Sequence, residues 1–293
     1  MALGMSAAAL LTVTGAGAVF WLHSTTLTEA AEPRPAPPPE AQAAPASPAE
    51  MPPGNSLPLP PEPPRLTDSP EYDTCLTLLR TEPEDALAMA EAWEQHGGGE
   101  GARHCTALAQ LALGEPERAA GRLERLASES KAGNAARAAV YAQAVQAWTM
   151  ANQPGRAYGA STMALTLSPE DPALLVDRAL AAASLGRYDE ALLDLNYALK
   201  LEPGRPDTLV FRAAALRHLD RQTDAMDDVE SALARDPGHP EALLERGILK
   251  QLKGDTAGAR RDWQRTVEAA PDSAAADLAR QNLALNEAGP RRR

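Results

Sequence analysis

An arginine and an aspartate that recur along the chain are the first candidates for chemistry. Arg178 and Asp194 could form a charged pair in which the guanidinium orients an anion and the carboxylate accepts a proton. Both residue types return 34 residues later and again after another 34, whereas a catalytic pair is needed only once. We therefore interpret these residues as structural ion pairs, each joining two helices of one unit: Arg178 with Asp194, Arg212 with Asp228, and Arg246 with Asp262.

Other motifs that carry chemistry are missing from the sequence. It contains no G-x-S-x-G nucleophile elbow, no phosphate-binding P-loop and no H-E-x-x-H zinc motif. The run GGGEG at residues 97–101 lacks the lysine of a phosphate loop and indicates a connection between helices. The histidines and cysteines follow no usual zinc spacing. We therefore expect a protein that is not an enzyme and that uses no catalytic residue, cofactor or metal.

The two cysteines lie about one repeat apart, and we expect both in the first helices of successive units. Neighbouring first helices pack side by side, so the Cα atoms of Cys75 and Cys105 would come within bridging distance. Combined with an export segment, this arrangement predicts a disulfide. The alternative is a pair of buried free thiols in a reducing compartment.

Composition limits the class of fold and the class of partner. Alanine is very frequent and aromatic residues make up only 4%, which favours closely packed helices and an all-α fold. The formal net charge of −12 argues against a surface for nucleic acid or anionic lipid, because phosphate binding needs clustered lysine and arginine. We expect neither nucleic acid nor a small-molecule substrate as a partner.

The N-terminal residues 1–30 are predicted to be a targeting segment. Residues 3–22 carry no charge and are mostly apolar, which is just long enough for a helix to cross a bilayer. The segment is interpreted as an uncleaved membrane anchor. The alternatives are a signal cleaved after Ala30 and a chain that is not exported. The alanine-, arginine- and proline-rich usage indicates a bacterial source, so an exported domain would lie on the periplasmic side of the inner membrane.

A proline-rich linker is predicted at residues 31–69. Residues 33–70 hold 15 of the 26 prolines, and proline lacks a donor N–H and restricts its predecessor. No packed element is expected there, only a disordered, extended polyproline-II spacer. A PxxP ligand for an adaptor domain is the competing interpretation.

A 34-residue repeat follows the linker. Four columns keep one register: a proline, a small residue, an alanine and a bulky apolar residue. Within each unit the apolar positions are spaced three and four apart, which predicts two amphipathic helices. A turn at Gly186, Asp220 or Gly254 separates them, and a proline ends the second helix. The columns are Pro169, Pro203, Pro237 and Pro271; Ala179, Ala213 and Gly247; Ala191, Ala225 and Ala259; Leu195, Val229 and Trp263.

This pattern resembles the tetratricopeptide repeat, in which a small residue, an A-x3-F motif and a closing proline recur every 34 residues. Leucines 175, 209 and 243 stand where the family usually has tryptophan. The resemblance implies a right-handed α-solenoid of helix–turn–helix repeats over residues 70–287. The expected parts are divergent units 70–99 and 100–137, clearer units 138–171, 172–205, 206–239 and 240–273, a capping helix 272–287, and a basic tail 288–293.

By the same resemblance, the first helices line a groove that binds peptides or helices of partner proteins. Family members that bind acidic C-termini place Lys, Arg and Asn there, whereas the positions in this chain are mostly apolar. We therefore expect an amphipathic helix or peptide of a partner protein, docked by its apolar stripe. The alternative is that several of these residues pack between units. The expected groove residues are Val176, Leu180, Val210, Phe211, Ala214, Leu244 and Ile248.

These features together predict a membrane-tethered, exported scaffold that binds protein partners during cell-envelope assembly or secretion. One alternative is an architectural subunit of an envelope complex. Another is a cytosolic co-chaperone, if the N-terminus is not an export signal.

Overall fold

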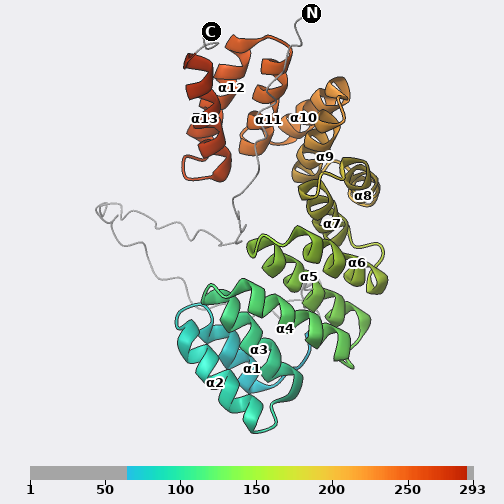
Figure 1. Ribbon diagram of the computed structural model, residues 1–293, viewed down its shortest axis with the longest axis vertical. Coiled ribbons are helices and arrows are strands. Elements are labelled where there is room, and N and C mark those ends of the chain that lie inside the picture. The colour runs from blue at the N-terminus through green and yellow to red at the C-terminus, as the bar shows by residue number, and fades with distance from the viewer. Residues whose placement is uncertain (1–64, 289–293) are drawn as a thin grey trace, which may run out of the picture. The chain divides into compact units, whose positions relative to one another are not determined.

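The computed structural model describes residues 65–288, and this range contains helices and no strand (Figure 1). The all-α class and the stack of helical hairpins predicted from the sequence are therefore confirmed for this range. The predicted targeting segment, the linker up to residue 64 and residues 289–293 lie outside the described residues. The helices are α1 (Pro70–Leu78), α2 (Pro83–Gln95), α3 (Gly99–Ala112), α4 (Pro116–Glu129), α5 (Asn134–Met150), α6 (Pro154–Leu167), α7 (Pro172–Ser184), α8 (Tyr188–Leu201), α9 (Pro206–His218), α10 (Gln222–Arg235), α11 (Pro240–Leu252), α12 (Thr256–Ala269) and α13 (Ala274–Ala288).

Consecutive helices pair into hairpins that follow one another in chain order (Figure 1). Each odd-numbered helix from α1 to α11 is the first helix of a hairpin, and the next even-numbered helix is the second. First helices also contact each other, since α1 packs on α3, α5 on α7, α7 on α9, and α9 on α11. The last helix, α13, packs on α11 and α12 in the position of a further first helix. No helix among residues 65–288 is long and apolar enough to cross a membrane.

The turns inside the hairpins explain one column of the repeat. Gly186 and Gly254 have φ values of +74° and +84°, and Asp220 has +60°. This left-handed region is open to glycine and is tolerated by Asp and Asn far better than by branched residues. Asn152, at +53°, fills the same place between α5 and α6. The chain reverses at these residues, so both helices of a unit stop and start at fixed positions.

Prolines mark both ends of the hairpins. The four prolines that repeat every 34 residues each follow the end of a second helix by two residues, as at Leu201 and Pro203. Other prolines begin helices, where the missing N–H costs nothing because the first turn has no acceptor for it. At the last helix, Ser273 accepts a hydrogen bond from the N–H of Ala276 at 3.1 Å and so caps the N-terminus of α13.

The core of each hairpin depends on a small residue of the first helix that faces a bulky residue of the second. Ala213 and Val229 have this relation in one unit, and Gly247 and Trp263 have it in the next. A Cβ atom at residue 247 would lie 2.6 Å from Cδ1 of Trp263, which is too close for any side chain. The larger indole therefore requires the smaller partner. The combined volume of the small and the bulky side chain is therefore limited in each unit, although the residue type at each position changes from unit to unit.

The packed chain begins before the first helix. Leu66 packs against the core cluster that contains Ala107 and Tyr141, and Thr67 lies against Gly101 at the start of α3. The last five residues of the predicted linker, 65–69, therefore belong to the packed part of the molecule rather than to an extended spacer. A leucine between prolines on one side and a helix cap on the other was the signal for this.

Candidate functional site

The surface formed by the first helices α7, α9 and α11 is the candidate site, and we call it the first-helix face. Its residues are spaced three or four apart within each helix and recur at intervals of 34, so they lie on one side of neighbouring helices. The first-helix face consists of Val176, Asp177, Leu180, Phe211, Ala214, Arg217, Glu245 and Ile248.

The seven predicted groove residues are unequally placed. Leu180 is 38% exposed, whereas Val210 and Leu244 are only 5% and 8% exposed and pack inside core clusters. The side chains of Val210 and Leu244 therefore lie beneath the first-helix face and offer almost no exposed area for contact with a partner. The four that remain are half-buried and hold a surface apolar area: Val176, Phe211, Ala214 and Ile248.

One ion pair crosses this face between two first helices. Arg217 of α9 donates two hydrogen bonds to Glu245 of α11, from Nε to Oε1 at 2.5 Å and from Nη2 to Oε2 at 3.4 Å. Glu245 is only 6% exposed, and its burial raises the pKa of the carboxyl while the arginine opposes that rise. One unit earlier the two positions hold Ala183 and Phe211, so this contact is not repeated. The sequence gives no recurring column for this pair, because Arg217 and Glu245 each occur at their position in one unit only.

Asp177 occupies the same column of the repeat as Glu245. Its carboxylate is half-buried on α7, and none of the described residues gives it a hydrogen bond or an ion pair. Burial, together with the nearby charge of Asp171, raises the pKa of Asp177 to about 6, although Arg205 lowers it. The face predicted to be apolar therefore carries an acid that has no hydrogen-bond or ion-pair partner among the described residues. The available signal was a column of the repeat that carries an acid in two units, Asp177 and Glu245.

His239 joins the N-terminal ends of α9 and α11. Its Nε2 lies 3.0 Å from Oδ1 of Asp207, and its Nδ1 lies 3.3 Å from Oε2 of Glu241. Hydrogen bonds to Asp207 and Glu241 raise the pKa of His239 to about 9, although burial acts in the opposite direction. The imidazole is therefore charged at neutral pH and is held between two carboxylates.

The recurring arginines and aspartates lie between the two helices of each unit, away from the first-helix face. Arg212 donates to both carboxylate oxygens of Asp228, from Nε at 2.7 Å and from Nη2 at 2.6 Å. Its third contact, from Nη1 to Oδ1 of Asn196 at 2.9 Å, reaches the second helix of the unit before. Arg178 makes the same two bonds to Asp194. Bidentate pairs of this kind fix the geometry of both partners.

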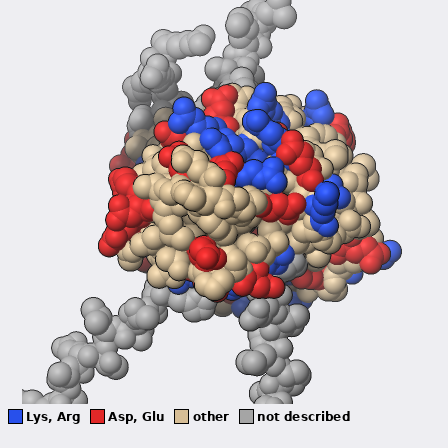
Figure 2. All heavy atoms as spheres, turned by 90° about the horizontal axis from the view of Figure 1, so that it is seen from below, with Lys and Arg blue, Asp and Glu red and all other residues tan. Residues whose placement is uncertain are grey.

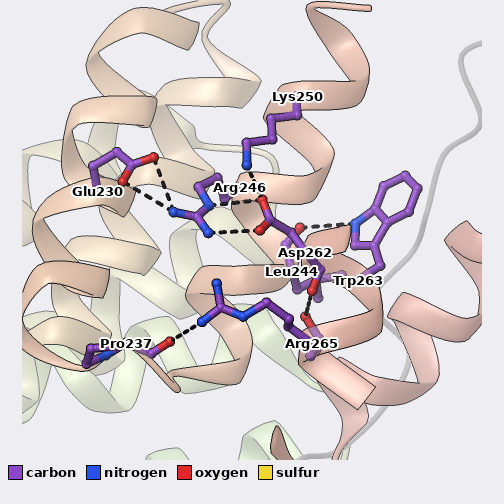
Figure 3. A network of polar contacts seen from close by, with 9 residues as sticks. Glu230, Pro237, Leu244, Arg246, Lys250, Asp262, Trp263 and Arg265 are labelled. Atoms are coloured by element: carbon purple, nitrogen blue, oxygen red, sulfur yellow. Dashed lines mark hydrogen bonds and ion pairs between the residues drawn. The ribbon is translucent and has the colours of Figure 1, made fainter. Parts of the chain in front are cut away.

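The last of these pairs is part of a larger network, shown in Figure 3. Arg246 donates to Asp262 through Nε and Nη2, at 2.9 and 2.8 Å, and reaches back to Glu230. Lys250 adds a second cation, with its Nζ 2.7 Å from Oδ2 of Asp262. Burial alone would raise the pKa of Asp262, but the bonds from Arg246 and Lys250 hold it below its usual value. Both carboxylate oxygens of Asp262 therefore accept hydrogen bonds inside the fold.

Two hollows lie outside the first-helix face. One, of about 210 Å³, lies beside the network of Figure 3, and it is lined in part by Arg265, which donates to the carbonyl oxygen of Pro237 at 3.0 Å. The other, of about 350 Å³, lies between α2, α3 and α4 and is lined by Glu94, Arg103, Arg122, Arg125 and Leu126. Figure 2 shows basic and acidic side chains interspersed on the face viewed from below, beside a wide area that carries neither. Neither hollow is enclosed by apolar side chains as most ligand pockets are.

At the other end of the stack, α1 is fixed to α3 by a covalent and a polar contact. Cys75 and Cys105 are joined by a disulfide with their Cα atoms 6.2 Å apart, and both are fully buried. Beside it, the hydroxyl of Tyr72 lies 2.5 Å from Nδ1 of His104, whose Nε2 lies 2.5 Å from Oε1 of Gln143 on α5. Burial lowers the pKa of His104. A neutral ring with one acceptor and one donor nitrogen satisfies both bonds.

Side chains that could together hold a metal ion do not converge in the described part of the chain. Residues 65–288 contain no set of three or more His, Cys, Asp or Glu side chains placed to hold a metal ion. The buried aspartates of the recurring pairs accept their hydrogen bonds from neighbouring cations of the fold, as Asp262 does from Arg246 and Lys250. What the arrangement offers chemically is a half-apolar surface with a few fixed charges.

Comparison with known proteins supports the repeat assignment. Residues 147–216 match the model of the tetratricopeptide repeat family. MamA (residues 41 to the end) from Desulfovibrio magneticus RS-1 is a similar solved structure, with a TM-score of 0.51, 18% identity, and coverage of 59% of this chain and 97% of that one. No curated protein sequence matches the chain significantly. The fold of the repeats is thus shared with a known solenoid.

Two further solved structures are similar to parts of this chain. YrrB, described as a TPR protein with an unusual peptide-binding site, has a TM-score of 0.48 at 19% identity and covers 67% of this chain and 97% of its own. The second TPR domain of human RPAP3, solved with an HSP70 peptide, has a TM-score of 0.39 at 23% identity and covers 40% and 98%.

Proposed function

We propose that this protein is a non-enzymatic interaction module that binds a peptide or helix of a partner protein on the first-helix face. Tetratricopeptide repeats typically mediate contacts between proteins, and residues 147–216 match that family. The observation that carries the proposal is the open apolar area of the face. Leu180 is exposed, and Phe211 and Ile248 are half-buried, on three helices that pack side by side.

The second part of the proposal concerns where this module works. The uncharged apolar residues 3–22 would anchor the chain in a bacterial inner membrane, and the proline-rich residues would hold the repeats away from it on the periplasmic side. The disulfide between Cys75 and Cys105 supports an oxidising compartment. The process served would be envelope assembly or secretion. Recovery of the full chain in the soluble fraction after cell breakage, with both thiols free, would contradict this part.

An architectural role is the second candidate, and one observation favours it. On α3 the residues equivalent to the first-helix face are covered by the chain itself, because Leu66 and Thr67 pack there and Tyr72 covers His104. A part of the stack whose face is already filled has only its outer surface for contacts. The proposed binding site therefore does not extend onto α3.

Site-specific photo-crosslinking in the native cell tests the binding proposal. A photoreactive residue is placed at Phe211 on the first-helix face and, as the control, at the exposed Arg261 on α12. We expect a discrete protein adduct from position 211 and none from position 261. Adducts from position 261 alone would support the architectural role and contradict the binding site. A cytosolic partner such as a chaperone, captured at position 211, would contradict the export proposal but not the binding one.

A further inference from the structure

One column of the repeat crosses the first-helix face and continues onto α5, and every polar side chain in this column except one has a partner from the preceding first helix. The column runs through Gln143, Asp177, Phe211 and Glu245, one residue in each successive unit. Gln143 is bonded to His104 of α3, and Glu245 is bonded to Arg217 of α9. Each of these two acceptors thus receives its hydrogen bond from the first helix of the unit before.

Asp177 has no such donor. The position that Arg217 holds relative to Glu245 is held relative to Asp177 by Thr149, since both lie 28 residues upstream. The hydroxyl of Thr149 is already donated to the carbonyl oxygen of Val145 on its own helix, at 2.8 Å. The fold therefore builds a donor for the carboxylate at 245 and builds none for the carboxylate at 177.

Among the described residues, the neighbourhood of Asp177 adds negative charge and apolar area, and the nearby cation Arg205 makes no hydrogen bond or ion pair with Asp177. Arg205, which begins the turn into α9, already pairs with Glu202 at 3.2 Å. Asp171 lies near enough to raise the pKa of Asp177 further. On the other side, Leu180 is one helical turn away and exposed. Phe211 occupies the position on α9 that is equivalent to Asp177 on α7. A half-buried carboxylate without a donor is costly, and it is less costly when a cation covers it.

We propose that the first-helix face binds a partner segment that is both basic and apolar, with a Lys or Arg of the partner paired to Asp177. An apolar side chain one helical turn away on the partner packs against Leu180 and Phe211. The partner's cation takes the place that Arg217 takes for Glu245 in the last unit. The proposal rests on the proposed function and adds the chemistry of the partner to it.

A displayed library of random 15-residue peptides tests the proposal with the full-length chain. Peptides are selected on the wild-type protein and are kept only if they fail to bind Phe211→Asp, so that every retained peptide uses the first-helix face. Their affinities are then measured on Asp177→Asn and on Asp177→Lys. The matched control is Asp189→Asn, which removes the same charge from an exposed position on α8. Circular dichroism melting checks that each variant is folded.

We expect the retained peptides to be enriched in Lys or Arg next to apolar residues. Their binding should weaken about tenfold or more in Asp177→Asn, as for loss of a partly desolvated charge pair, and should be unchanged in Asp189→Asn. The Asp177→Lys protein should prefer peptides in which the basic residue is replaced by Glu. The melting temperature of Asp177→Asn should not fall, because the carboxylate has no partner to lose.

Three results would count against the proposal. Retained peptides without basic enrichment, or with equal affinity for Asp177→Asn, would overturn it and leave the binding site intact. A library from which no peptide depends on Phe211 would overturn the proposed function as well. Binding that becomes dependent on Asp177 only after residues 289–293 are removed would show that the chain's own Arg291–Arg293 tail occupies the site.

Discussion

Two first helices, α3 and α7, use equivalent positions in opposite ways. When the turn glycines Gly114 and Gly186 are aligned, His104 of α3 corresponds to Val176 of α7. His104 is 5% exposed and lies beneath Tyr72. On α7, Val176 is half-buried, and Leu180, one helical turn further on, is 38% exposed. The same backbone unit therefore serves as core or as surface. What decides is whether another part of the chain lies over it.

The two regions also differ in how they hold their helices together. The α1–α3–α5 region uses a disulfide and a string of neutral hydrogen bonds through His104, both buried. The α7–α12 region uses bidentate ion pairs that recur in each unit, such as Arg212 with Asp228. The N-terminal region should therefore respond to reductant, and the C-terminal region to loss of charge.

Removing the disulfide should have the largest effect, and it should be confined to the N-terminal region. The bridge spans 30 residues, and closing a loop of that length stabilises by roughly 3.5 kcal/mol. In the Cys75→Ser/Cys105→Ser double variant we expect hydrogen exchange of the α1 amides to accelerate by about two orders of magnitude, while α9 and α11 are unchanged. Equal acceleration in α11 would show that the two regions unfold as one unit.

Breaking one ion pair should be the matching test of the C-terminal region. Asp228→Ala leaves Arg212 half-buried with only Asn196 as a partner, which should cost about 3 kcal/mol. Urea unfolding followed at α9 by hydrogen exchange measures the loss, and the exposed neighbour Asp227→Ala is the control. Binding per folded molecule should not change. Lost binding with an unchanged unfolding midpoint would mean that the pair belongs to the site.

The small-to-bulky contact of the last unit predicts an intermediate effect. Gly247→Ala places a Cβ against Trp263, and overpacking of this kind costs about 2 kcal/mol. Combining it with Trp263→Leu recreates the pairing of Ala179 with Leu195 and should recover most of the loss in a double-mutant cycle. If the two costs simply added, the explanation by shared volume would be wrong.

A change of pH should give the smallest effect and should act only between α9 and α11. The pKa of His239 is raised to about 9 by its bonds to Asp207 and Glu241, so its contribution to stability is complete below pH 6.5 and is lost as the pH rises through 9. We expect roughly 1–2 kcal/mol, because Asp207 remains exposed to water. Melting temperature measured from pH 6.5 to 9.5 should fall for wild type and stay flatter for His239→Gln.

Much of the fold could be predicted from the sequence because each repeat needs the same types of residue at the same positions. The turn at Gly186 and Asp220, and the arginines that face aspartates, were each predicted from columns. The contacts that occur once could not be found this way. The bond from Arg217 to Glu245 and the packing of Leu66 depend on which segments meet in space, and neither has a second copy to reveal it. The apolar residues of the candidate site were predicted from the sequence, but its charged residues Asp177, Arg217 and Glu245 were not.

The arginine contacts carry a consequence for how such a chain can gain or lose units. Arg212 reaches back to Asn196 and Arg246 to Glu230, and these two acceptors share one column of the repeat. Deleting residues 206–239 would place Arg246 in the position of Arg212. Arg246 could then donate to Asn196 as Arg212 does now. The same deletion would remove Arg217 and leave Glu245 facing Ala183. The backward contacts of the arginines therefore tolerate the loss of this unit, whereas the contact between Arg217 and Glu245 makes the joint between α9 and α11 specific to its present neighbours.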